Sequence, residues 1–141
     1  MVGVCHVLII YATHLIDIYR PMAYNSDMSI IIKTTPAFDR KSEKIMSKQA
    51  LEDFYDHISQ HPDIGPVIPG TAGVRKIRWK SGLNDKGKSG GIRILYHCSD
   101  DILVILITMY EKSEKDNITQ AERNELKRML PLLVSKYRGE L

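Results

Sequence analysis

The feature that most constrains the fold is an almost uninterrupted apolar run, "ILVILITMY", at residues 102–110. A strand of this composition has no polar side to turn toward water, so it belongs in the middle of a sheet that is covered on both faces. Its purely apolar part, Ile102 to Ile107, is far shorter than the roughly 18 residues that cross a bilayer. The run therefore predicts a globular protein with a buried central strand and no membrane partner.

Two segments before this run have the alternation of half-buried strands. In "VRKIRW" (74–79), Ile77 and Trp79 share one face, while Lys76, Arg78 and the following Lys80 share the other. In "IRILYH" (92–97), Arg93 points opposite to its apolar neighbours, and we expect it to be exposed. These segments and the apolar run predict an antiparallel meander, and "SIIIK" (29–33) is also strand-like.

Helices are predicted on either side of these strands in the sequence. Thr35 and Ser47 are suitable N-caps for two helices, or one bent helix, before residue 64. Thr119 with Glu122 has the capping-box spacing of a last helix, and Pro131 is expected to break that helix near Met129–Leu130. The predicted fold class is α+β, with a small antiparallel sheet packed against N-terminal helices and a C-terminal helix.

Length and cysteine usage bear on domain organisation and compartment. A chain of 141 residues fits one compact domain. Because Met28 directly precedes the strand-like "SIIIK", we expect residues 1–27 to be an extension and 28–141 to be the functional domain. Cys5 and Cys98 have no metal or redox spacing, which indicates a cytoplasmic protein with free thiols.

The positive charge of the chain is concentrated in one short region. Residues 75–93 contain seven basic residues and one acidic residue, whereas the net charge of the whole chain is only +3. A concentrated positive field on a mildly acidic body indicates a binding site for a polyanion. The plain alternative is a solvated run of charge.

The same region contains "GLNDKGKS" (82–89), which matches the P-loop pattern for binding nucleotide phosphates. A P-loop needs a helix to follow it, because the backbone N–H groups at the start of that helix hold the phosphate. Here Gly90 and Gly91 are followed by "IRI", which predicts a strand. We therefore reject nucleotide binding, and expect glycines at 87, 90 and 91 to let a nucleic-acid backbone approach Lys86 and Lys88.

The string "GVRKIRW", then "GKSGGIRILYH", an apolar strand, "MYEKSEKDNIT" and a closing helix resembles the RelE-like toxins of bacterial toxin–antitoxin pairs, within them the HigB-type branch. The resemblance spans Met28 to Leu141. It implies an mRNA endonuclease that enters the ribosomal A site, cuts the codon there and inhibits translation. It also implies no metal or cofactor, and a cognate antitoxin, expected to be of helix-turn-helix type, that forms a hetero-oligomer with the toxin.

In this family the ribose 2′-hydroxyl attacks the adjacent phosphorus, often with lysines and arginines as the acting groups. A lysine crowded by other cations has a lowered pKa and can accept a proton. Carried over by position, the resemblance assigns Lys76 as general base, Arg78 and Arg93 as phosphate clamps, and Lys112 as charge stabiliser or acid. For each of these residues a solvated surface position or a surface ion pair remains the alternative.

Other residues are expected to position RNA, namely Arg75, Lys80, Lys86, Lys88, His97 and Lys115, and His97 could also act as an acid or base. The tyrosine that some family members place after the final strand is replaced here by Ile118, while Tyr96 and Tyr110 are expected to be core residues. Two other functions remain open. Relatives with this fold poison DNA gyrase without nuclease residues, and a non-catalytic nucleic-acid-binding module would carry similar charge.

Overall fold

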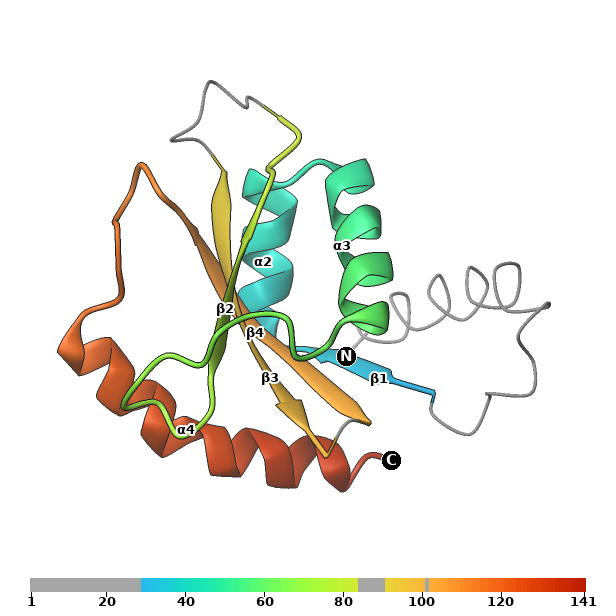
Figure 1. Ribbon diagram of the computed structural model, residues 1–141, viewed down its shortest axis with the longest axis vertical. Coiled ribbons are helices and arrows are strands. Elements are labelled where there is room, and N and C mark those ends of the chain that lie inside the picture. The colour runs from blue at the N-terminus through green and yellow to red at the C-terminus, as the bar shows by residue number, and fades with distance from the viewer. Residues whose placement is uncertain (1–28, 84–90, 101) are drawn as a thin grey trace.

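A computed structural model describes residues 29–83, 91–100 and 102–141 of the chain. Within them, three helices pack on one four-stranded sheet (Figure 1). The elements are β1 (Ile31–Thr34), α2 (Pro36–Ile45), α3 (Lys48–Gln60), β2 (Arg75–Trp79), β3 (Ile92–Ser99), β4 (Leu103–Glu111) and α4 (Gln120–Arg138). The expected extension, residues 1–27, lies outside the described residues.

The sheet is mixed, with the strand order β1-β4-β3-β2. Strands β2, β3 and β4 form the predicted antiparallel meander. The expectation of a wholly antiparallel sheet is wrong, because β1 pairs in parallel with β4, from Ile31 opposite Leu103 to Thr34 opposite Leu106. A parallel pair requires a long crossover. The helices α2 and α3 with the first two meander strands supply it.

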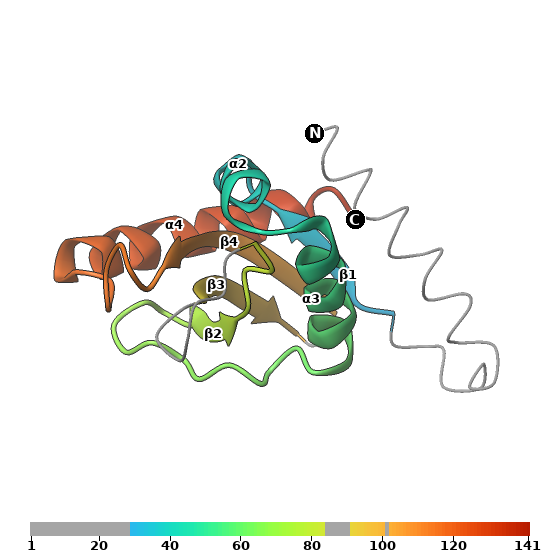
Figure 2. The same cartoon turned by 90° about the horizontal axis from the view of Figure 1, so that it is seen from above.

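Strand β4 lies between β1 and β3 and is buried on both faces, as its apolar sequence predicts. On one face α2 and α3 contribute Phe38, Phe54 and Ile58 to a first core with Ile94 and Tyr96. On the other face α4 closes a second core, to which Leu95, Ile105, Leu126, Leu130 and Tyr137 belong. Seen from above, β4 lies next to α4, and β3 and β2 follow at increasing distance (Figure 2).

The predicted helix starts are confirmed by their hydrogen bonds. The Thr35 hydroxyl accepts from the Phe38 N–H at 3.1 Å, and the Ser47 hydroxyl accepts from the Ala50 N–H at 3.0 Å. At the start of α4, Thr119 and Glu122 form a complete capping box. These caps satisfy N–H groups that have no partner within the helix.

Helix α4 does not break at Pro131, contrary to expectation, and continues from Gln120 to Arg138. Proline removes one backbone donor and strains the turn before it. Pro131 is exposed, so water can satisfy the carbonyl left without a partner, while Leu126 and Leu130 before it and Tyr137 after it are buried in the second core. Packing on both sides of the proline therefore keeps one helix. None of the helices in the described ranges has the length and apolarity needed to cross a membrane.

A β-bulge interrupts the pairing of β3 with β4. Leu95 lies opposite Thr108 and Tyr96 opposite Leu106, so Ile107 is an extra residue on β4. Leu103, Ile105 and Ile107 face the second core, and after the bulge the even-numbered Tyr110 faces it instead. A bulge re-aims the side chains that follow it. Here it turns Tyr110 toward the side of the sheet on which α4 packs.

Candidate functional site

Strand β2 separates its apolar and its cationic side chains as the sequence predicts. Ile77 and Trp79 pack against the first core. Lys76 lies opposite Leu95, and Arg78 opposite Arg93. Residues directly opposite each other in an antiparallel pair share a face, and Leu95 belongs to the second core. Lys76, Arg78 and Arg93 therefore lie on the α4 side of the sheet, and we call these three residues the basic face.

Arg93 is buried, with 7% of its surface exposed, so the expectation of an exposed strand arginine is wrong. Its guanidinium forms no ion pair with any residue of the described ranges, and its hydrogen bond to the Ile92 carbonyl is long, at 3.5 Å. A like charge, Arg78, lies directly opposite it. Like charges in such a pair destabilise a sheet, and a buried charge without a partner is costly. The arrangement is therefore unfavourable unless an anion binds.

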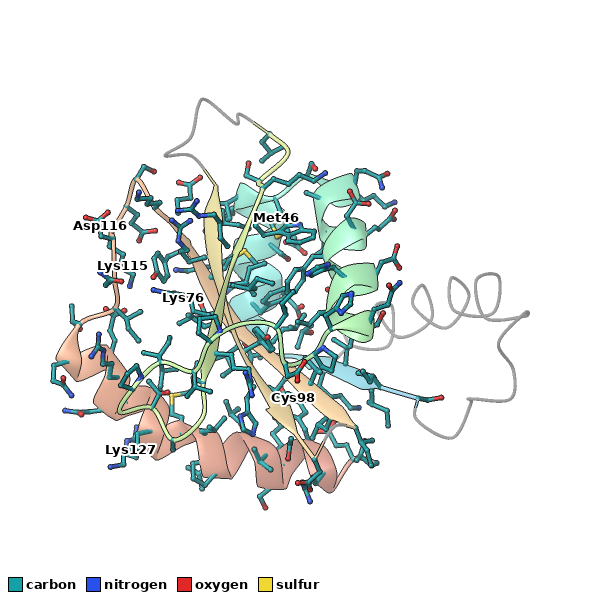
Figure 3. The ribbon with its side chains drawn as sticks, in the orientation of Figure 1. Met46, Lys76, Cys98, Lys115, Asp116 and Lys127 are labelled. Carbon is teal, nitrogen blue, oxygen red and sulfur yellow. The ribbon has the colours of Figure 1, made fainter. Side chains whose placement is uncertain are left out.

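The segment between β4 and α4 adds further polar groups beside the basic face. The Lys76 ammonium donates a hydrogen bond to the Asn117 side-chain carbonyl at 3.3 Å. Figure 3 shows Lys76 pointing from β2 toward the segment that carries Lys115 and Asp116. Lys112, half-buried, is the first residue after β4, and its N–H donates to the Gly91 carbonyl at 3.3 Å. Lys112 thus lies at the end of the sheet where β3 begins.

Lys115, which is expected to position RNA, has an acidic partner in the structure. Its ammonium forms an ion pair with the Glu122 carboxylate and lies 5.1 Å from the centroid of the Tyr110 ring. The hydrogen bond from Lys115, followed by that from the Thr119 N–H, lowers the pKa of Glu122. Glu122 therefore links the basic region to the capping box of α4.

Tyr110 lies opposite Arg93 on the same face, 2% exposed. Its hydroxyl oxygen is buried and has no hydrogen-bond partner in the described part of the chain. Burial raises the pKa of Tyr110, while the neighbouring charges of Arg93 and Lys115 oppose that rise. Tyr110 is a core tyrosine as expected, but its hydroxyl lies among the charges of the site.

Three residues expected to position RNA lie apart from the basic face or are engaged elsewhere. Arg75 donates to the Asp63 and Gly65 carbonyls at 3.0 and 2.7 Å. Lys80, which by alternation is expected on the face of Lys76 and Arg78, instead follows the end of β2 and pairs with Asp53 on α3 at 3.3 Å. His97 Nδ1 lies 2.9 Å from the Gly73 carbonyl, beside the second core. Arg75 and Lys80 therefore have structural partners, and His97 is occupied by the loop before β2.

Lys86 and Lys88 lie outside the described residues, as do Gly87 and Gly90. The segment that carries them joins β2 to β3, which pair antiparallel, so strands flank it as expected. The backbone conformation and the close packing at position 91 both require glycine. The φ of Gly91 is +97°, and a Cβ there would lie 2.9 Å from the Trp79 carbonyl oxygen. Ile118 is buried in the second core.

Sequence reasoning missed four polar residues of this region, namely Tyr110 as a polar group, Asn117, Glu122 as a partner of Lys115, and Arg123, whose buried Nε has no partner among the described residues. The capping-box spacing predicts that Glu122 caps the start of α4, but it does not predict the ion pair of Glu122 with Lys115. The side of the sheet that Tyr110 faces depends on the bulge at Ile107, and an apolar run gives no sequence signal for the position of a bulge.

The chain matches no protein-family model. A functional proposal therefore has to come from its own side chains.

Proposed function

We propose that the protein is a metal-independent endoribonuclease that cuts mRNA at ribosomal A-site codons, and thus the toxin of a RelE-like, HigB-type toxin–antitoxin pair. The observation that carries the proposal is the basic face. Lys76, Arg78 and Arg93 come together from two adjoining strands, and none of them pairs with a carboxylate in the described ranges. Cations gathered without acidic partners favour a polyanionic ligand.

The proposed reaction needs three roles that these side chains can fill. Neutral Lys76 would take the proton of the ribose 2′-hydroxyl as its oxygen forms a bond to the adjacent phosphorus. Arg78 and Arg93 would stabilise the charge that develops on the phosphate oxygens. As the bond to the 5′-oxygen breaks, Lys112 would give that oxygen a proton. The products would be a 2′,3′-cyclic phosphate and a free 5′-hydroxyl.

The contact between Lys76 and Asn117 supports the first of these roles. The amide carbonyl accepts from the lysine without adding a negative charge beside it. A carboxylate at the same place would favour the protonated lysine, which cannot act as a base. Asn117 thus helps to position the Lys76 amine without placing a negative charge beside it.

The proposed partners are the ribosome, its mRNA, and an antitoxin that blocks the basic face until it is removed. Contacts of cationic side chains with phosphates carry no sequence information and weaken with salt. We therefore propose that codon choice comes from the ribosome and that the protein supplies the chemistry.

A gyrase poison of the same fold is the second candidate, and a non-catalytic nucleic-acid-binding module is the third. A gyrase poison acts by protein contact and has no use for a buried, unpaired arginine beside a second one. A binding module would use the cations but not cleave. A single assay with defined substrates separates all three.

The test is a translation extract programmed with one defined mRNA, with the fragment ends mapped. We expect cuts within A-site codons that disappear when ribosomes are removed. Intact mRNA together with inhibited DNA supercoiling would contradict the proposal and indicate a gyrase poison. Intact mRNA with salt-sensitive RNA binding would indicate the non-catalytic module.

A further inference from the structure

Two buried polar side chains that face each other across β3 and β4 lack the partners that burial normally requires. The Tyr110 hydroxyl is buried without a hydrogen bond, and Arg93 is 7% exposed without an ion pair, in each case within the described residues. An unsatisfied buried polar group costs about 1–3 kcal/mol, and more when it is charged. Both groups are donors, so one acceptor placed between them would satisfy both.

The pairing of the strands places the two side chains next to each other, and the charge of Arg93 acts on the Tyr110 hydroxyl. Arg93 and Tyr110 are direct cross-strand neighbours, with Cα atoms about 4.5–5.5 Å apart in such a pair. The bulge at Ile107 is what turns Tyr110 to the side of Arg93. Without the extra residue, Tyr110 would face the first core. The juxtaposition thus depends on an irregularity that the strand pairing alone does not need.

A third donor, Lys115, lies over the Tyr110 ring and already holds an anion. Its ammonium is 5.1 Å from the ring centroid and pairs with the Glu122 carboxylate. The other oxygen of that carboxylate accepts from the Thr119 N–H at 2.9 Å. Glu122 is therefore held in place by the helix start and supplies Lys115 with an acceptor while Arg93 and Tyr110 have none.

We propose that Arg93, the Tyr110 hydroxyl and Lys115 form a subsite for the oxygens of a phosphate group, and that Glu122 competes with that phosphate for Lys115. A phosphate offers several acceptors to converging donors, and charge-assisted hydrogen bonds are the strong ones. The inference deepens the proposed function, on which its link to RNA rests. Binding of phosphate itself does not depend on cleavage.

The same geometry assigns a gating role to Glu122. Tyr110 and Arg93 are almost fully covered, so a phosphate reaches them only after side chains move, and Lys115, over the Tyr110 ring, places this movement in the segment between β4 and α4. That movement separates Lys115 from Glu122. The capping bonds of Glu122 and Thr119 remain available to re-form the closed state. The free protein is then closed, and phosphate binding opens it.

The test titrates the full chain with inorganic phosphate at constant ionic strength, by calorimetry or by NMR shifts. We expect Tyr110→Phe, which removes only the hydroxyl, to weaken phosphate binding at least about tenfold, since hydrogen bonds to a charged acceptor are the strong ones. Glu122→Gln should strengthen binding several-fold because it removes the competing charge. Tyr110→Phe should fold normally, because the lost hydroxyl has no partner among the described residues.

Tyr96→Phe is the matched control. The Tyr96 hydroxyl accepts from the Gly65 N–H at 2.9 Å, on the other side of the sheet, so phosphate affinity should not change. A second arm uses an uncleavable DNA oligonucleotide. If only the oligonucleotide binds, and Tyr110→Phe weakens that binding, the subsite belongs to the nucleic-acid backbone. If Tyr110→Phe weakens the binding of inorganic phosphate to the same degree, the subsite takes small anions as well.

The subsite would be overturned if Tyr110→Phe bound both probes with the affinity of the wild-type protein. It would also be overturned if the wild-type protein bound neither inorganic phosphate nor the oligonucleotide more tightly than chloride. If wild-type protein leaves mRNA intact while Tyr110→Phe still weakens phosphate binding, the proposed function fails and the subsite remains. If mRNA is cut while the Tyr110→Phe variant binds like wild type, the subsite fails and the nuclease remains.

Discussion

At the scale of single residues, Arg93 shows the conflict between stability and the proposed function. Removing a guanidinium from water costs several kcal/mol, which an ion pair only partly offsets. Arg93 has no ion pair in the described ranges and lies opposite Arg78. Polar groups that lower stability persist where a ligand uses them. The proposed phosphate would give this arginine the anionic partner that the described part of the fold does not supply.

We predict that Arg93→Met leaves the free energy of unfolding unchanged or raises it by about 1–2 kcal/mol, because an apolar side chain fills a buried site without the cost of burying a charge. Urea denaturation measures this difference. Lys48→Met, at an exposed position of α3 away from the basic face, is the control and should change stability by less than about 0.5 kcal/mol. A loss above about 1 kcal/mol in Arg93→Met would mean that the guanidinium stabilises the fold.

At the scale of elements, the local patterns were sufficient for the meander, the buried central strand and the helix starts. Alternation places Ile77 and Trp79 on one face and Lys76 and Arg78 on the other, and hydroxyl caps at Thr35, Ser47 and Thr119 need only neighbours in sequence. These features depend on short-range geometry, which residue types encode directly.

Long-range features could not be predicted in the same way. The parallel pairing of β1 with β4 joins residues such as Ile31 and Leu103, and no local pattern specifies the partner. The bulge at Ile107 falls in an apolar run, where a shift by one residue leaves apolar side chains on both faces. The alternation that normally reports register is absent there. The sequence therefore did not predict that Tyr110 lies beside Arg93, or that Arg93 is buried there.

The continuous α4 yields a prediction at the same scale. Pro131 lies inside the helix and is exposed, so Pro131→Ala should restore a backbone donor without disturbing the second core. We expect a gain of about 1–3 kcal/mol in the free energy of unfolding. Lys127→Ala, another exposed position of α4, should change it little. A loss of stability on Pro131→Ala would mean that the proline shapes the packing of α4.

At the scale of the whole molecule, the two sides of the sheet differ in composition. The side covered by α2 and α3 is a plain apolar core, with the Tyr96 hydroxyl satisfied by the Gly65 N–H. The side covered by α4 combines an apolar core with the basic face, the unpaired Tyr110 hydroxyl and the Lys115–Glu122 pair. A rigid sheet supported from behind can hold cations close together against their repulsion. In the proposed function, this rigidity would pre-organise the cations for a phosphate.

The most direct measurement compares cleavage of one defined mRNA in a translation extract by variants on and off the basic face. Lys76→Ala, Arg78→Ala and Arg93→Met should each cut A-site codons at least about a hundredfold more slowly, as expected for lost transition-state contacts. Lys44→Ala and Lys48→Ala, at exposed positions of α2 and α3, should cut like wild type. Equal rates for both groups, with all variants folded, would contradict the account.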